Sequence, residues 1–220
     1  MGLSLSSLAI LCSLTVISRS DLSARLGSLA ASDIANRDAR GTAIICLGDS
    51  VTQGIGASSG RDYPHLLSAM LGQPVINAGV DGDETVDALK RLDTDVLAKH
   101  PRLVIVELGA DDFLDGVPLA QAFTNLDEIV RRIQASGAMV MVVGFDPPFL
   151  EGRLRKDYER LIRARHVAFV PAIYQYLWIN PQLKHDALHP NDRGYALIAQ
   201  RIYRVVAPLV EPPPARSATR

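Results

Sequence analysis

Cysteine is scarce in this sequence. Cys12 and Cys46 are the only two among 220 residues. So small a number excludes a framework of disulfide bonds and a zinc site built from cysteines. Cys46 lies within an apolar run, and we expect it to be a small residue of the core.

An excess of charge of one sign is also lacking. The 23 basic and 24 acidic residues leave a net charge of −1. Domains that bind nucleic acid typically carry a marked basic excess. We therefore expect no nucleic-acid partner, and the composition leaves the oligomeric state open.

A long hydrophobic run is missing too. The apolar stretch Leu8–Ile17 is too short to span a bilayer, so we expect no stable membrane span. No Lys or Arg precedes it, and the residues after it form a poor cleavage site. Two interpretations stay open: a cleaved signal or membrane-proximal anchor, and an ordinary leading helix. The protein is periplasmic or secreted if residues 1–20 act as a signal, and cytoplasmic otherwise.

What the sequence does contain is a regular alternation of apolar and amphipathic stretches. The apolar runs predict these strands: Ala43–Leu47, Val75–Asn77, Leu103–Leu108, Met139–Val143 and Val167–Val170. The stretches between them predict these helices: Tyr63–Leu71, Glu84–Lys99, Leu119–Ser136, Arg153–Arg165 and Tyr195–Val206. Such alternation predicts an α/β fold with about five parallel strands covered on both faces. We expect one domain over residues 41–210, a leader or helical extension over 1–40, and a disordered Pro-rich tail over 211–220.

Ligand sites of such folds lie beyond the carboxyl ends of the strands. Ser50 follows the first strand there, although a Ser in this place is also a common helix N-cap. Asp186 and His189 lie three residues apart before Pro190, where one loop can present both side chains, or simply start a helix. A Ser hydroxyl needs a base to become a nucleophile, and this pair can supply one. The sequence does not form the G-x-S-x-G elbow, because position 52 is Thr.

Gly79 follows the second strand. Its backbone N–H and that of Ser50 could together hold a developing oxyanion, since a Gly lets a ligand approach closely. A plain turn at the end of a strand is the other interpretation.

Four short motifs carry a family resemblance. In chain order they are GDSVTQG, NAGVDGDET, ELGADDFLDGVP and LKHDALHPN. They resemble the four motif blocks of the GDSL/SGNH hydrolase superfamily, and its bacterial lysophospholipase/thioesterase/arylesterase branch fits best. The resemblance covers Ala43 to Val206. It implies a flavodoxin-like three-layer α/β/α sandwich, with Ser50 as nucleophile, Gly79 as oxyanion donor, and Asp186 and His189 as the acid and base.

Two positions depart from the family pattern. The Leu of the first block is Val51 here, which is a mild change. The Asn of the third block, normally a side-chain donor to the oxyanion, is Asp111. An ionised Asp accepts hydrogen bonds and cannot donate one. Asp111 could be protonated, it could be tolerated while the backbone donors act alone, or the enzyme could be weak or repurposed.

The sequence therefore predicts a serine esterase that cleaves lipid, acyl or aryl esters, or thioesters, through an acyl-enzyme and without cofactor or metal. Its partner would be a small ester substrate. Phe113, Phe145 and Pro147 could line an apolar groove for that substrate, or could equally anchor loops to the core. A carbohydrate O-deacetylase of the same superfamily is one alternative. A ligand-binding or phospho-acceptor module using Asp49, Asp111 and Asp112 is another, which leaves the pair of Asp186 and His189 unexplained.

Overall fold

The computed structural model describes residues 31–210, except 146, 148, 149, 151, 172, 175 and 176. Its centre is a parallel sheet with the strand order β2-β1-β3-β4-β5. The strands are β1 (Ala43–Gly48), β2 (Val75–Gly79), β3 (Pro101–Glu107), β4 (Met139–Val143) and β5 (Ala168–Val170). The predicted fold class, a five-stranded parallel α/β sheet, is confirmed.

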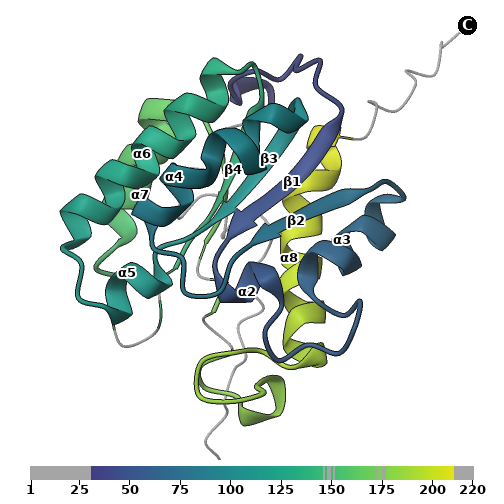
Figure 1. Ribbon diagram of the computed structural model, residues 1–220, viewed down its shortest axis with the longest axis vertical. Helices are drawn as coiled ribbons and strands as arrows, with labels where there is room; N and C mark the ends of the chain where they lie inside the picture. The colour runs from purple at the N-terminus through teal and green to yellow at the C-terminus, as the bar shows by residue number, and fades with distance from the viewer. Residues whose placement is uncertain are drawn as a thin grey trace, which may run out of the picture.

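Helices cover both faces of this sheet (Figure 1). One face carries α3 (Tyr63–Leu71) and α8 (Asp192–Val210), which pack against each other. The other face carries α4 (Thr85–Asp95), α6 (Leu119–Ala135) and α7 (Arg155–Arg165). Two short helices, α2 (Ser50–Gln53) and α5 (Ala110–Leu114), follow directly after strands, and one-turn 3₁₀ helices lie at Ala31–Asp33, Leu97–Lys99 and Pro181–Leu183. The molecule is thus the three-layer α/β/α sandwich that the resemblance implied.

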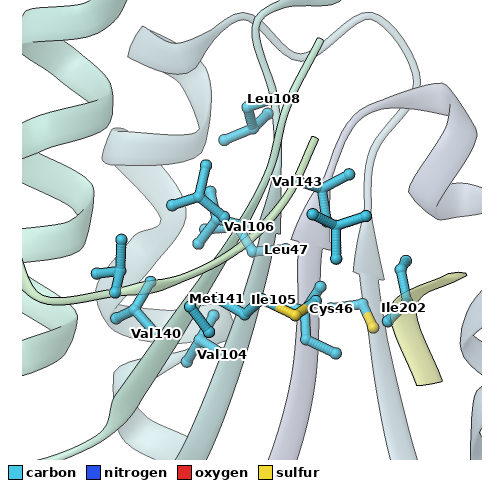
Figure 2. Packing of buried hydrophobic residues seen from close by; sticks show 14 of the residues in the cluster. Cys46, Leu47, Val104, Ile105, Val106, Leu108, Val140, Met141, Val143 and Ile202 are labelled. Carbon is cyan, nitrogen blue, oxygen red and sulfur yellow. The ribbon is translucent and has the colours of Figure 1, made fainter. Parts of the chain in front are cut away.

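The core lies along the central strands (Figure 2). Cys46, Val104, Ile105 and Met141 have no exposed surface at all, so Cys46 is confirmed as a core residue. Residues of both pleat directions are buried because each face of the sheet is covered by helices, which explains why the strands are apolar almost throughout. Burial of each large aliphatic side chain contributes roughly 1.5–3 kcal/mol before the entropy cost of folding.

Four helices differ from their predicted bounds: α6 ends one residue earlier and α7 begins two residues later, while α4 and the last helix differ more. The stretch Glu84–Lys99 was expected to form one helix, but α4 ends at Asp95 and a 3₁₀ turn follows. His100 then adopts a left-handed φ of 51°, which turns the chain into β3. The last helix begins at Asp192, because the Asn191 side chain accepts the N–H groups of Arg193 and Gly194. Pro190 therefore precedes this helix.

The end of the predicted N-terminal extension packs onto the domain. Ile34 is buried in the core. The Asn36 side chain donates to the carbonyls of Gln134 and Ala138 at 2.8 and 3.0 Å. Residues 1–30 and 211–220, where the leader and the tail were predicted, lie outside the described residues. None of the described helices has both the length and the apolar character needed to cross a membrane.

Candidate active site

The strand order predicts a ligand site at the carboxyl ends of β1 and β3. Chain connections leave these neighbouring strands in opposite directions, since β2 flanks β1 and β4 flanks β3. Such a switch point is where doubly wound α/β folds bind their ligands. Ser50 begins α2 directly after β1, and Asp111 lies in α5 after β3.

The structure brings the three predicted side chains Ser50, Asp186 and His189 together. His189 Nε2 lies 3.2 Å from Ser50 Oγ. His189 Nδ1 lies 2.8 Å from Asp186 Oδ2. The geometry is that of a nucleophile, a base and an acid that orients the base.

The Asp186 carboxylate is itself held by backbone donors. Its Oδ1 accepts the N–H groups of Leu188 and His189, both at 2.8 Å. These bonds, led by the one from the His189 backbone and joined by the His189 ring, hold the pKa of Asp186 well below its usual value. Asp186 therefore stays ionised at any pH of interest and can stabilise a protonated His189 ring.

A sharp turn after β1 presents Ser50. Asp49 caps α2, because its Oδ1 accepts the Val51 N–H at 2.9 Å. Gly48 cannot be replaced without a shift of its neighbours, since a Cβ there would overlap the Thr52 hydroxyl and the Glu107 carbonyl. Ser50 itself is buried except for 8 % of its surface, with its hydroxyl facing His189.

The backbone N–H of Gly79 is already bonded within its own strand. Its N–H donates to Asn77 Oδ1 at 2.9 Å, and it does not line the cavity beside Ser50. Gly79 is needed for another reason: a Cβ would overlap the backbone of Thr52 and Gln53 where β2 meets α2. Strand β2 continues to Gly79, two residues beyond its expected end, so Gly79 lies within the sheet and not after it.

Gly82 is a second glycine of the same motif, three residues after Gly79. It follows Asp81, which lines the cavity, and has a left-handed φ of 77°. Among the described residues, no acceptor for its N–H is found. The same motif thus contains a second glycine whose donor is free, and the regular spacing of the sequence could not distinguish the two.

Asp111 lies where the family pattern has Asn, and it lines the cavity. Burial raises the pKa of Asp111 to about 6, and the negative charges of Glu107 and Asp115 add to the shift. The neighbouring Asp112 is fully buried and accepts the Thr85 N–H at 2.8 Å and the Thr85 hydroxyl at 2.6 Å. Both carboxyl oxygens of Asp112 are thereby occupied by Thr85, the first residue of α4. In the part of the chain that the structure describes, no three His, Cys, Asp or Glu side chains are grouped to hold a metal ion.

An apolar wall lies opposite the catalytic side chains. The cavity beside Ser50 has a volume of about 140 Å³. The wall is formed by Ala110, Phe113, Leu114, Phe145, Tyr174, Trp178 and Leu188. The Phe145 ring packs against those of Phe113 and Tyr174, with centroids 5.9 and 5.7 Å apart. Phe113 and Phe145 thus line the cavity and also pack on aromatic neighbours, as the two interpretations in the sequence analysis had it, whereas Pro147 is buried and does not line the cavity.

Comparison with known proteins identifies the family of this chain. A family model described as the GDSL-like Lipase/Acylhydrolase family matches residues 46–197. The chain belongs to this family. It is therefore a hydrolase that acts on ester bonds, and the resemblance predicted from the four motifs is confirmed.

Individual relatives extend over most of this GDSL-like hydrolase. The Thioesterase 1/protease 1/lysophospholipase L1 of Escherichia coli K12 is 29% identical over 182 residues, which cover 79% of this chain and 88% of that protein. The Arylesterase of Vibrio mimicus is 32% identical over 169 residues, covering 71% and 84% respectively. The crystal structure of TesA superposes with a TM-score of 0.71 at 25% identity, and covers 77% of this chain and all of that one.

The sequence analysis of the hydrolase missed part of the cavity wall. Tyr174 and Trp178 were not expected there, because aromatic residues after a strand are more often packing residues. Leu188, which is 43% exposed, lies between Asp186 and His189 in the motif and lines the cavity beside His189. The one sequence signal for Leu188 as a cavity residue was its position inside the last motif block.

Proposed function

We propose that this hydrolase cleaves neutral aryl esters and short-chain acyl esters through an acyl-enzyme on Ser50. The observation that carries the proposal is the continuous contact from Ser50 Oγ to His189 Nε2 at 3.2 Å and from His189 Nδ1 to Asp186 at 2.8 Å. It connects a nucleophile, a base and an orienting acid next to a cavity. These three side chains supply the attack and the proton transfers of acyl transfer.

The reaction has two steps. His189 Nε2 takes the proton of the Ser50 hydroxyl while Oγ attacks the acyl carbon, and the imidazolium then gives that proton to the leaving alcohol. A water molecule, deprotonated by His189, attacks the acyl-enzyme and releases the carboxylic acid and Ser50. Asp186 stays ionised throughout and stabilises the imidazolium at each stage.

We assign the oxyanion donors to the N–H groups of Ser50 and Gly82, in place of Gly79. The Ser50 N–H lies in the first turn of α2, and the Gly82 N–H has no acceptor among the described residues. Asp111 is the third candidate. Protonated, it can donate to the oxyanion as an Asn would; ionised, it opposes the negative charge.

The cavity supports the choice of substrate. A cavity of roughly 150 Å³ lined by apolar side chains holds a benzene ring. The 140 Å³ cavity here has aromatic walls of similar character. It suits an aryl group or an acyl chain of a few carbons better than a long fatty chain. The arylesterase from Vibrio mimicus is a relative whose name agrees with this substrate class.

The location of the protein in the cell depends on the role of its first residues. We propose export to the periplasm or beyond if residues 1–20 act as a signal, and a cytoplasmic location otherwise. Sequencing the N-terminus of the mature protein from its own cell decides between them, because removal of these residues occurs only on export.

The decisive experiment combines labelling with kinetics. A fluorophosphonate probe should label the wild type and fail to label Ser50→Ala. Ser50→Ala and His189→Ala should each lower kcat for p-nitrophenyl acetate by about 10⁴- to 10⁶-fold. Ser58→Ala, outside the cavity, is the matched control and should keep both the labelling and the kcat of the wild type. A Ser50→Ala variant that is still labelled and active would overturn the mechanism, and faster hydrolysis of palmitate than of butyrate esters would overturn the substrate class.

A further inference from the structure

Two carboxyl groups are buried next to the turn that presents Ser50. Asp49 follows the end of β1, and Glu107 is the last residue of β3. Gly48 is paired with Glu107 in the sheet, so the two acids come from adjacent strands. Asp49 has no exposed surface and Glu107 has 1 %. Burying two carboxylates side by side is strongly unfavourable unless donors satisfy them.

Glu107 is well supplied with donors. Its Oε2 accepts the Thr52 hydroxyl at 2.9 Å, and its Oε1 accepts the Tyr174 hydroxyl at 2.6 Å. Tyr63 lies 2.8 Å from the same Thr52 oxygen and can donate to it, which leaves the Thr52 proton for Glu107. Among the described residues, no Lys, Arg or His forms an ion pair with Glu107. Its surroundings therefore consist of neutral donors that all point at one anion.

Asp49 has one oxygen without a donor. Its Oδ1 accepts the Val51 N–H, but no donor for the buried Oδ2 is found among the described residues. Glu107 lies on the adjacent strand, and a side-chain hydrogen bond between Asp49 and Glu107 is among the causes that act on the pKa of both groups. Two ionised carboxylates both accept and cannot bond to each other, so this contact requires a proton between them.

We propose that Asp49 and Glu107 share one proton, which Asp49 Oδ2 carries and donates to the Glu107 carboxylate, and that this bond positions Ser50. With the proton there, each of the four carboxyl oxygens has a hydrogen-bond partner. Asp49 becomes neutral and Glu107 keeps the single negative charge of the pair. The bond ties the turn that presents Ser50 to β3, and it removes one negative charge from near the place where the oxyanion forms.

The charges around the pair favour the same placement. Burial, followed by the negative charges of Glu107 and Asp111, raises the pKa of Asp49 well above its usual value. Burial also raises the pKa of Glu107, but the bonds from Tyr174, Thr52 and Asp49 oppose that rise. The other titratable groups that face the pair are the hydroxyls of Tyr63 and Tyr195 and the Cys46 thiol, all neutral near pH 7. The proton therefore belongs on Asp49.

Infrared spectroscopy of the whole protein tests the shared proton. The measurement is made at pH 8 in an Asp111→Asn background, because Asp111 is another acid with a raised pKa. The carbonyl band of a protonated carboxyl group should be present and should disappear in Asp49→Asn. Carboxyl ¹³C labelling of aspartate, and not of glutamate, should shift the band. The absence of the band at pH 8, or a shift with labelled glutamate alone, would overturn the proposal.

Kinetics test the positioning role, which rests on the esterase function proposed above. Asn at position 49 keeps both an acceptor for the Val51 N–H and a donor for Glu107, whereas Ala keeps neither. We expect kcat of Asp49→Ala to lie about 10- to 100-fold below that of Asp49→Asn, with KM changed by less than about twofold. Equal kcat values would overturn the positioning role. The infrared result does not depend on activity, so it distinguishes failure of this inference from failure of the proposed function, and it decides the matter if Asp49→Ala does not fold.

Discussion

At the scale of single residues, Asp111 and His189 make opposite demands on pH. His189 must be unprotonated to take the Ser50 proton, whereas Asp111 must be protonated to donate to an oxyanion. The pKa of Asp111 is raised to about 6, so its protonated fraction falls as the pH rises through that value. At neutral and alkaline pH the carboxylate then faces the developing negative charge.

This conflict predicts the effect of Asp111→Asn. An Asn donates at every pH, and a lost oxyanion donor typically costs about 10²- to 10³-fold in rate. We therefore expect kcat for p-nitrophenyl acetate to rise at least about tenfold at pH 8 and to change little at pH 5. A kcat profile from pH 5 to 9 measures this. A large drop in kcat at pH 8 would show that the carboxyl group has a role of its own.

The stability of the same variant is an independent check. Because the folded pKa of Asp111 lies above that of the unfolded chain, the folded state loses stability as the pH rises from about 4 to about 6. A shift of two pKa units corresponds to about 3 kcal/mol, which solvent screening of this partly exposed group reduces to about 1 kcal/mol. The free energy of unfolding of Asp111→Asn should exceed that of the wild type by this amount at pH 8 and match it at pH 4.

The residue scale also shows how far sequence could predict the site. Asp186 and His189 could be found because three residues of one loop are enough to bring their side chains together. Ser50 could be found because it follows a strand whose exit is fixed by Gly48. Gly82 could not be chosen over Gly79, since the choice depends on where β2 ends. Glu107 could not be recognised as Asp49's partner, because only the pairing of β1 with β3 joins them.

At the scale of elements, stretches with a clear apolar pattern were predicted as the right kind of element, and the shortest helices were not predicted. Strand β4 and helix α3 have the predicted bounds, since a buried strand and an amphipathic helix each leave a clear apolar pattern. The helices α2 and α5 have only four and five residues, too few to show a period. They nevertheless carry Ser50 and Asp111, so the elements that matter most for the site are those that sequence reveals least.

The contact between β2 and α2 yields a prediction at this scale. In Gly79→Ala the new Cβ would overlap the backbone of Gln53, so β2 and α2 must move apart and Ser50 with them. We expect the free energy of unfolding to fall by about 1–3 kcal/mol, as for other overpacked sites, and kcat to fall about tenfold or more. Denaturant unfolding and p-nitrophenyl acetate hydrolysis measure the two effects.

Gly72→Ala is the matched control for this substitution. Gly72 has a left-handed φ of 64° at the end of α3, with open space where a Cβ would lie. The Gly72→Ala variant should lose about 1–2 kcal/mol of its free energy of unfolding from backbone strain and should keep the kcat of the wild type. If Gly79→Ala loses stability but keeps kcat as Gly72→Ala does, the contact supports the fold and has no part in holding Ser50.

At the scale of the whole molecule, the near-zero net charge conceals an uneven distribution. The chain carries a net charge of −1, yet the cavity is lined by Asp81 and Asp111, besides the buried Asp49 that we infer to be neutral, and, among the described residues, by no Lys or Arg. Sequence counting could not reveal this, because Asp81 and Asp111 follow β2 and β3 and meet only at the sheet edge. A cleft lined by one sign of charge repels ligands of the same sign.

The uneven charge predicts discrimination against anionic esters. The neutral butyrate ester of p-nitrophenol and its hemisuccinate are similar in size, but the hemisuccinate carries a carboxylate. We expect kcat/KM to favour the butyrate, and the ratio of the two values to fall about fivefold in Asp81→Asn. Such a change corresponds to about 1 kcal/mol, the interaction of two unit charges about 4 Å apart in bulk water. Raising the ionic strength should also reduce the ratio, because salt screens exposed charges.

Asp93→Asn is the matched control. It removes the same charge from α4, at a residue that pairs with Arg132 and does not line the cavity, and it should leave the ratio unchanged. Equal effects of Asp81→Asn and Asp93→Asn would assign the discrimination to net charge alone, and a hemisuccinate cleaved as fast as the butyrate would contradict it altogether.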